Sequence, residues 1–320
     1  ILNNLKLADR ERNFAIPAGK TCLICAAGSS LDGKIEYIKN NRGFFFIIAT
    51  DTAFKTLASE NIFCDAVISI DGQMVSHSHF MEKINPKTIF IFELMANHSA
   101  VRKIAKNTEN ILFTVSSHPF EQLLNLFKKD SFLKIDSTSG TVTIAALDFA
   151  KKAGFSKIEI IGADFAYLNG KPYAKGTYLD IINYSNQTKL STAEKEFSRL
   201  MFRTELLELS ENKKTTETLK FYEQNLFSWC RNNNCTITKE DDAYKILNSS
   251  GQKEEIKNGP FDLKSFLAHI SKPENSEETE TALLPYIAWL KTCIKNDENI
   301  SFKEYSKLAL NFILRYNYKI

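Results

Sequence analysis

The residues best suited to chemistry lie in one stretch, from Asp136 to Tyr173. It contains the polar turn Ser139-Gly140-Thr141, the triplet Gly162-Ala163-Asp164, and the tyrosines Tyr167 and Tyr173. Small polar residues at the start of a helix can bind an anion, because free backbone amides and the positive end of the helix dipole meet there. Tyrosine hydroxyls can donate hydrogen bonds to a departing phosphate. The stretch therefore indicates chemistry on a phosphate-bearing ligand.

The elements around this stretch should place its polar residues at one edge of a sheet. Small and apolar residues recur at helical spacing from Val142 to Ala153, and Gly154 ends the predicted helix. Lys157 to Ile161 is typical of a short buried strand, so Gly162 to Asp164 follow its carboxyl end, where open α/β sheets bind ligands. Asn169-Gly170 provides a turn that could bring Tyr173 back over that edge. An ordinary helix cap remains the alternative explanation for Ser139 to Thr141.

A second glycine-containing turn, Gly28-Ser29-Ser30, follows the first predicted strand, Thr21 to Ala26. The dinucleotide-binding pattern G-x-G-x-x-G is absent from this turn. Residues 28–34 fit G-x-x-x-x-G-K, but Ile35 replaces the hydroxyl residue that a P-loop requires, so we interpret the match as accidental. We expect this turn and the Ser139-Gly140-Thr141 turn to converge on one phosphate and cytidine.

Two more predicted strands end in acidic residues. Asp51 follows the strand 44–50, and Asp71-Gly72-Gln73 follows the strand 65–70. Asp51 could equally cap the next helix or face a ligand. Asp71 is expected to bind a ribose hydroxyl or a cation. His77 and His79 do not predict a metal site, because their spacing would place them on different faces of a helix.

The order of these motifs resembles two enzyme families. Thr138-Ser139-Gly140, the small-residue helix, residues 154–165 and the two tyrosines resemble the metal-independent bacterial sialyltransferases. The turn Gly28 to Leu31 and the run Asp65 to Asp71 resemble the motility-associated factor (Maf) flagellin glycosyltransferases, whose core domain is related to 6-hydroxymethylpterin diphosphokinase. Maf proteins commonly have proline where this chain has Ser29.

The resemblance implies a Rossmann-like fold and transfer of a nonulosonic, sialic-acid-like sugar from its CMP-activated form to flagellin or another protein or glycan acceptor. It implies no metal, and no cofactor beyond this donor. Tyr167 and Tyr173 would bind the leaving phosphate. We also place Asp164 in the catalytic set, where it is expected to bind a sugar hydroxyl or to hold the turn. The residues predicted to bind the donor are Gly28, Ser29, Ser30, Asp51, Asp71, Gly72, Gln73, Ser139, Gly140 and Thr141.

One position departs from the sialyltransferases, which use a histidine as general base after a lid segment. This chain has no histidine between His118 and His269, which leaves Asp164, Asp71, Glu93 and His118 as alternatives. Two other functions therefore stay open. One is a diphosphokinase that uses ATP with Mg²⁺ held by Asp51, Asp65 or Asp71. The other is a catalytically silent protein that binds flagellin or a glycan.

Composition limits the classes of protein to which the chain can belong. Its 320 residues are 43% hydrophobic and 25% charged, which is typical of a globular protein with a sizeable core. A formal charge of +3, from 41 basic and 38 acidic residues, does not indicate nucleic-acid binding. No apolar run approaches the roughly 18 residues that span a bilayer. We expect a cytoplasmic protein whose six cysteines are buried free thiols, Cys22 and Cys25 pointing to opposite sides of a strand.

Alternating strands and helices predict an α/β fold with a mainly parallel sheet and helices on both faces. The expected organisation is an N-terminal segment, 1–18, a nucleotide-sugar-binding catalytic domain, 19–247, and a C-terminal helical region, 248–320, that is accessory or oligomerising. Residues 176–190 are predicted to form an irregular lid loop. Helices at 192–210 and 216–231 and a short strand at Thr236-Ile237 should follow.

Overall fold

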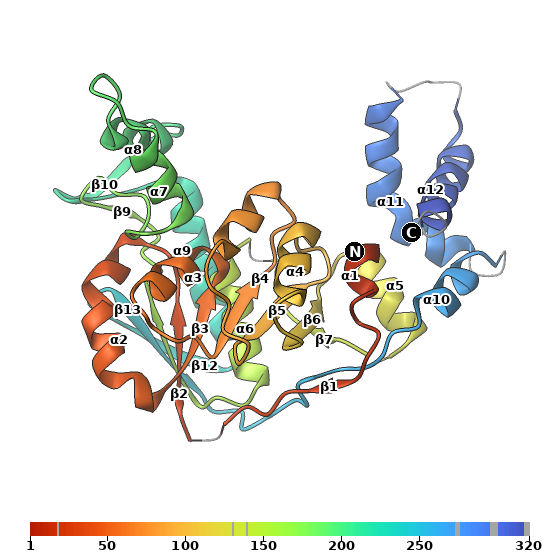
Figure 1. Cartoon of the computed structure of the whole chain (residues 1–320), viewed down its shortest axis with the longest axis horizontal. Coiled ribbons are helices and arrows are strands. Elements are labelled where there is room, and N and C mark those ends of the chain that lie inside the picture. The colour runs from red at the N-terminus through yellow and green to blue at the C-terminus, as the bar shows by residue number, and fades with distance from the viewer. Residues whose placement is uncertain (18, 130, 139, 273–275, 295–299, 317–320) are drawn as a thin grey trace.

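The structure, a computed structural model, describes residues 1–17, 19–129, 131–138, 140–272, 276–294 and 300–316 (Figure 1). Its centre is a nine-stranded sheet of order β12-β13-β8-β2-β3-β4-β5-β6-β7. Neighbours from β8 to β7 are parallel, whereas β13 and β12 run antiparallel at one edge. The strands are β2 (Thr21–Cys25), β3 (Phe45–Thr50), β4 (Ala66–Ser69), β5 (Ile89–Glu93), β6 (Ile111–Val115), β7 (Leu133–Lys134), β8 (Lys157–Ile161), β12 (Cys235–Glu240) and β13 (Ala243–Asn248).

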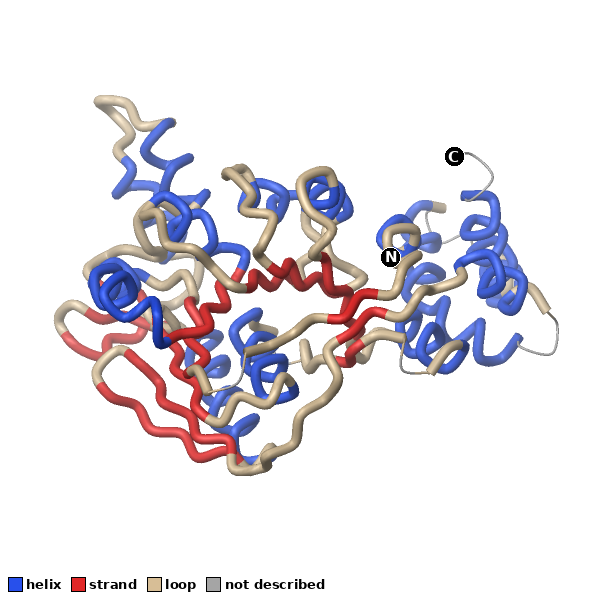
Figure 2. The backbone as a smooth tube through the Cα atoms, turned by 60° about the horizontal axis from the view of Figure 1, so that its bottom comes forward, coloured by secondary structure: helices blue, strands red, loops and turns tan. Residues whose placement is uncertain are grey.

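Helices cover both faces of the sheet because its central strands are apolar on both sides (Figure 2). All six residues of β3 are buried, for example. One face packs against α2 (Ile35–Asn41), α3 (Asp51–Ser59), α4 (His98–Ala105) and α5 (Pro119–Phe127). The other packs against α6 (Val142–Lys152) and α9 (Glu217–Asn232). The predicted α/β fold class is confirmed.

The order of strands reverses at β2. Strands β3 to β7 are added one after another on one side of β2, whereas β8 pairs with its other side, Cys22 opposite Ile158. In open α/β sheets such a reversal separates the loops at the carboxyl ends of the two strands and leaves a crevice for ligands. Here these are the loops that follow β2 and β8.

A projecting lobe rises beyond the carboxyl ends of the strands (Figure 1). It contains a small sheet of β9 (Tyr167–Leu168), β10 (Leu207–Ser210) and β11 (Lys213–Thr215), with α7 (Tyr178–Ser185) and α8 (Ala193–Met201). Two predictions are wrong here. The expected loop 176–190 contains α7, which Thr177 caps, and the expected helix 192–210 ends at Met201 because residues 207–210 pair with β11.

The strand predicted at Thr236-Ile237 is longer in the structure, and a second strand lies next to it. β12 spans Cys235–Glu240, and β13, which was not predicted, lies between β12 and β8. The hairpin turns at Asp241, whose φ is 51°. Local pattern did not reveal β13 because it alternates buried and exposed residues over only part of its length.

The N-terminal segment lies beside a segment from late in the chain. β1 (Arg12–Asn13) pairs with β14 (Lys257–Asn258), so the N-terminal segment runs beside the segment that leads to the C-terminal helices (Figure 1). Asn4, in α1 (Leu2–Leu5), is buried and donates to the carbonyls of Leu94 and Ala96 at 2.9 and 2.8 Å. The C-terminal helical segment is confirmed, as α10 (Leu263–Ile270), α11 (Ser276–Cys293) and α12 (Phe302–Tyr316).

The cysteines follow the prediction with one exception. Cys22 and Cys25 belong to cores on opposite faces of the sheet, and burial raises the pKa of both thiols. Cys293 is exposed in the last turn of α11, so the prediction that it is buried is wrong. Within the described residues, no helix has the length and apolarity needed to cross a membrane.

Candidate functional site

A crevice of about 350 Å³ opens where the strand order reverses. Its walls come from four segments: the turn after β2, the junction of β3 and α3, the residues that lead into α6, and the loop after β8. Helix α9 and the projecting lobe complete it. Six residues predicted for the site line this one cavity, and they are Gly28, Gly140, Thr141, Asp164, Tyr167 and Tyr173.

The turn after β2 packs directly on the loop after β8. The amide of Gly28 donates to the carbonyl of Gly162 at 2.7 Å. A Cβ on Gly28 would lie 2.5 Å from that oxygen and 2.6 Å from Oδ2 of Asp164, closer than atoms can approach. Glycine is therefore required at position 28 by the contact between the two loops.

Asp164 uses its carboxylate to hold the first turn. Its Oδ2 accepts hydrogen bonds from the Ser30 amide at 3.0 Å and from Ser29 Oγ at 3.5 Å, and its Oδ1 accepts from Ser30 Oγ. Burial raises the pKa of Asp164, and the hydrogen bonds from Ser30 partly oppose that rise. The two serines thus contact Asp164 and do not line the cavity.

The start of α6 faces the crevice. Thr141 caps the helix by accepting from the Ile144 amide at 3.3 Å, and Val142 and Thr143 also line the cavity. Gly140 has a φ of +78°, a conformation that favours glycine. Ser139 lies outside the described residues. An eleven-residue helix that begins at the cavity presents backbone amides and a positive dipole end to a ligand.

The two tyrosines reach the crevice from either side of a tight turn. Asn169 and Gly170, with φ of 50° and 69°, reverse the chain between them. The amide of Ala174 then donates to the Ala27 carbonyl at 2.9 Å, which ties the returning segment to the first turn. Burial raises the pKa of both phenols, so Tyr167 and Tyr173 are neutral hydrogen-bond donors at neutral pH.

The remaining predicted residues do not line the crevice. Asp51 is buried in the first turn of α3, where it accepts from the Thr52 amide at 2.7 Å and from Ser69 Oγ at 2.6 Å. Asp71 accepts from the Gln73 amide at 2.9 Å, and Gly72 and Gln73 are exposed in that turn. The other two candidates for the general base also lie away from the crevice. His118 caps α5 and lines a separate cavity, and Glu93 is buried at the end of β5.

Some residues that line the crevice were missed. Thr50 and Thr52, which flank Asp51, line the crevice. Their position as a polar pair at the end of a strand could have predicted this from the sequence. Tyr222 of α9 is also part of the wall, and its Cε1 lies 3.1 Å from where a Cβ on Gly140 would be. Local sequence carries no sign of this contact, because α9 reaches the crevice only through the tertiary fold.

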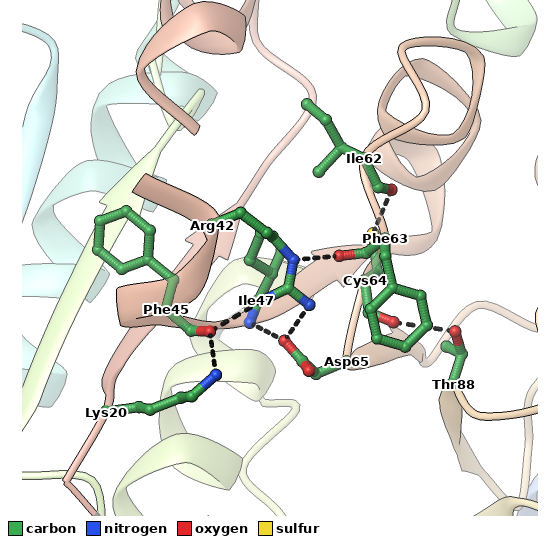
Figure 3. Close-up of polar contacts among 9 residues, drawn as sticks. All are labelled: Lys20, Arg42, Phe45, Ile47, Ile62, Phe63, Cys64, Asp65 and Thr88. Atoms are coloured by element: carbon green, nitrogen blue, oxygen red, sulfur yellow. Dashed lines mark hydrogen bonds and ion pairs between the residues drawn. The ribbon is translucent and has the colours of Figure 1, made fainter. Parts of the chain in front are cut away.

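Asp65, which was considered as a Mg²⁺ ligand, lies at the amino ends of the strands, whereas the crevice lies at their carboxyl ends. It precedes β4, so it is at the amino end of that strand. Its Oδ2 accepts from Arg42 Nη2 at 2.8 Å and from the Ile47 amide at 2.7 Å (Figure 3). Arg42 also donates to the carbonyls of Phe63 and Phe45, at 2.8 and 3.0 Å. Asp65 is therefore a structural residue.

Fold and crevice together define an open α/β protein with a cavity at the strand-order reversal. A family model described as 6-hydroxymethylpterin diphosphokinase MptE-like matches residues 1–170, more than half of the chain. The chain belongs to this family. An uncharacterized protein of Treponema pallidum (strain Nichols) is 30% identical over 257 residues, which cover 80% of this chain and 84% of that protein.

One solved structure is also similar, a Maf glycosyltransferase from Magnetospirillum magneticum AMB-1. It is 16% identical, with a TM-score of 0.41 over 52% of this chain. The match spans only 27% of that protein's length. Similarity of this extent establishes neither a shared activity nor a shared substrate.

Proposed function

We propose that this protein is a metal-independent glycosyltransferase. It moves a nonulosonic, sialic-acid-like sugar from a CMP-activated donor to a hydroxyl acceptor, such as Ser or Thr of flagellin. The observation that carries the proposal is the convergence of the Gly28 turn, the start of α6, Tyr167 and Tyr173 on one cavity. A volume of about 350 Å³ falls in the usual range for small-ligand sites.

The chemistry of the cavity wall favours a monophosphate leaving group. Among the described residues that line it there is no lysine or arginine, and Asp164 is the one carboxylate. A single phosphate can be bound by the amides at the start of α6 and by two phenols. A triphosphate carries more charge and usually requires lysine or arginine and a metal.

Tyr167 and Tyr173 act on the departing CMP in this mechanism. Negative charge on its phosphate grows as the bond to the sugar breaks, so hydrogen bonds from the phenols strengthen toward the transition state. Their raised pKa keeps both hydroxyls protonated throughout. The phenols orient and stabilise the phosphate without ionising.

Asp164 is the residue to which we assign deprotonation of the acceptor. Burial raises its pKa, and a carboxylate of raised pKa is a stronger base than an exposed one. As the acceptor hydroxyl attacks the sugar carbon, its proton passes to the carboxylate. The hydrogen bonds from Ser30 hold the carboxylate in place for this transfer.

The second candidate is the activity in the family's description, 6-hydroxymethylpterin diphosphokinase. It would transfer diphosphate from ATP and would draw on carboxylates for Mg²⁺. Three aspartates were considered for that role. Asp65 lies at the amino end of β4, away from the crevice, and neither Asp51 nor Asp71 is part of the cavity wall. Asp51 is the nearest in sequence, between the wall residues Thr50 and Thr52.

Calorimetric titration separates the two functions. The glycosyltransferase should bind CMP and CTP without Mg²⁺, and should turn over a CMP-activated nonulosonic acid in excess EDTA. The diphosphokinase should bind ATP only with Mg²⁺ and should form a pterin diphosphate. Turnover that EDTA abolishes and Mg²⁺ restores would contradict our proposal. Binding of CMP without any turnover would favour a catalytically silent protein.

A further inference from the structure

A buried polar cluster lies at the carboxyl ends of β5 and β6. Its centre is an acid pair, which we define as Glu93 and Glu121. Glu93 is the last residue of β5 and is 5% exposed, and Glu121, in the first turn of α5, is fully buried. The mechanism above uses neither residue.

Serine hydroxyls and one amide hold the acid pair in place. Oε2 of Glu121 accepts from the amide and the hydroxyl of Ser116, at 2.7 and 2.8 Å. Oε1 of Glu93 accepts from the hydroxyl of Ser137 at 3.5 Å. Thr114 is the neighbour of Glu93 in the sheet register, so its side chain lies on the same face.

Two oxygens of this cluster are unpaired. Among the described residues, neither Oε1 of Glu121 nor Oγ1 of Thr114 has a hydrogen-bond partner, although both atoms are buried. Two ionised carboxylates can only accept hydrogen bonds, so they cannot bond to each other. Glu121 lies near Glu93, because it bonds to Ser116, two residues beyond the strand partner of Glu93. A proton on one carboxylate makes it a donor that can bond to the other.

The surroundings provide little positive charge to the acid pair. The charged and titratable groups that face Glu121 are Glu93 and Tyr286. Burial lowers the pKa of His118, which caps α5, and so favours its uncharged form. In the described part of the chain, neither glutamate forms an ion pair with lysine or arginine.

Ser137 links the acid pair to the crevice. It belongs to the segment that leads through Gly140 and Thr141 into α6, whose start lines the cavity. Ser137 lies four residues before Thr141, the cap of α6, so a shift of Ser137 can be passed along the chain to the start of the helix. A change in charge at Glu93 can therefore reach the proposed donor site through one hydroxyl.

We propose that Glu93 and Glu121 share one proton at neutral pH, and that this proton holds the Ser137 segment in the conformation that binds the donor. When it is lost, two buried negative charges repel each other, and Glu93 moves from Ser137. Glu93 and Glu121 are thus positioning residues. Their effect on CMP rests on the proposed function, whereas the shared proton does not.

The direction of the pH dependence follows from the pKa values. Burial, with the nearby charge of Glu93, raises the pKa of Glu121 from 4.5 to about 7, and burial also raises that of Glu93. Because the pKa of Glu121 is higher in the folded state than in the unfolded state, its protonated form stabilises the fold. This contribution to the free energy of unfolding is complete below about pH 4.5 and is lost as pH rises through about 7. Donor binding should weaken over the same upper range.

The first experiment uses the protein without ligand. Carboxyl ¹³C NMR of protein labelled at glutamate should show one group that titrates near neutral pH. That titration should disappear in Glu121→Gln and in Glu93→Gln, and should persist in Glu109→Gln, whose side chain is 81% exposed. Carboxyls that all titrate below pH 5.5 would overturn the proposal. So would stabilisation by Mg²⁺ or Ca²⁺ that Glu121→Gln removes, since a cation would then occupy the cluster.

The second experiment measures CMP affinity between pH 6.5 and 8.5. The affinity of the parent protein should fall about tenfold, a coupling of ordinary size, whereas that of Glu121→Gln should change by about twofold or less. The phosphate of CMP loses its own proton near pH 6, so each variant is compared with the parent at the same pH. Parallel profiles would refute the link to Ser137. If the parent does not bind CMP at any pH, the proposed function fails, and the NMR titration still decides the shared proton.

Discussion

The carboxylate of Asp164 accepts hydrogen bonds from both the amide and the hydroxyl of Ser30, a residue 134 positions earlier in the chain. Ser30 follows β2 and Asp164 follows β8, so this contact joins the two loops on either side of the strand-order reversal. With Gly28 packed against Gly162, it sets the floor of the crevice.

Asp164→Ala should lower both stability and CMP affinity. It leaves the Ser30 amide without its acceptor, which costs about 1–3 kcal/mol of unfolding free energy for a buried donor and less for the partly buried Ser30. CMP affinity should fall at least tenfold as the first turn moves. Chemical denaturation and calorimetry measure the two effects. Ser29→Ala is the control, since Asp164 keeps both hydrogen bonds from Ser30 in that variant. Parent-like affinity in Asp164→Ala would show that the contact does not shape the crevice.

Gly28→Ala should separate the two loops. The added methyl would lie 2.5 Å from the Gly162 carbonyl and 2.6 Å from the Asp164 carboxylate, so the backbone must shift. We expect a loss of about 1–3 kcal/mol in stability, as is usual for overpacking, and loss of CMP binding. Gly33→Ala is the matched control, because a Cβ at position 33 would have no atom within 4 Å. Equal unfolding midpoints for the two variants would contradict the predicted close contact.

Tyr167→Phe or Tyr173→Phe should lower kcat by about 10- to 100-fold with little change in donor affinity. Phenylalanine keeps the packing of the ring and removes only the hydroxyl, so a loss in kcat reports a hydrogen bond that strengthens in the transition state. Tyr184→Phe, on the exposed part of α7, serves as the control. Steady-state kinetics with a CMP-activated sugar provide the measurement. If both variants turn over like the parent, the tyrosines only pack.

Asp65→Asn should destabilise the protein without changing ligand binding. The substitution removes the charge that pairs with Arg42, and the side chains of Arg42 and Asp65 are only 26% and 20% exposed. A buried pair that loses one partner costs roughly 3 kcal/mol or more, reduced here by partial exposure. Thermal denaturation and calorimetry with CMP, and with ATP and Mg²⁺, test this. Loss of Mg²⁺-dependent ATP binding in a folded variant would support the diphosphokinase function instead.

Local sequence was sufficient to predict the buried strands and the polar residues at their carboxyl ends. β3 is a short apolar run followed by Asp51, and β8 carries three isoleucines before Gly162-Ala163-Asp164. Such segments are recognisable without any partner strand. Thr141 was predictable as a helix cap for the same reason, since its hydrogen bond to Ile144 spans one turn.

The projecting lobe was not predictable in this way. Residues 207–210 have a charged and apolar pattern that also suits a helix, and only pairing with β11 makes them a strand. The same holds for β13, which gains its hydrogen bonds from β8 and β12 at once. Tertiary contacts outweigh weak local preference in such segments.

The sequence by itself determined which residues could contact a ligand, because residue type and local spacing decide caps, turns and buried strands. Only the tertiary structure decided which of them meet. It placed β8 beside β2, joined Asp164 to Ser30, brought Tyr222 against Gly140, and left Asp51 and Asp71 outside the cavity wall. The physical reason is range: strand order and long-range packing depend on contacts between segments far apart in the chain, which no local pattern encodes.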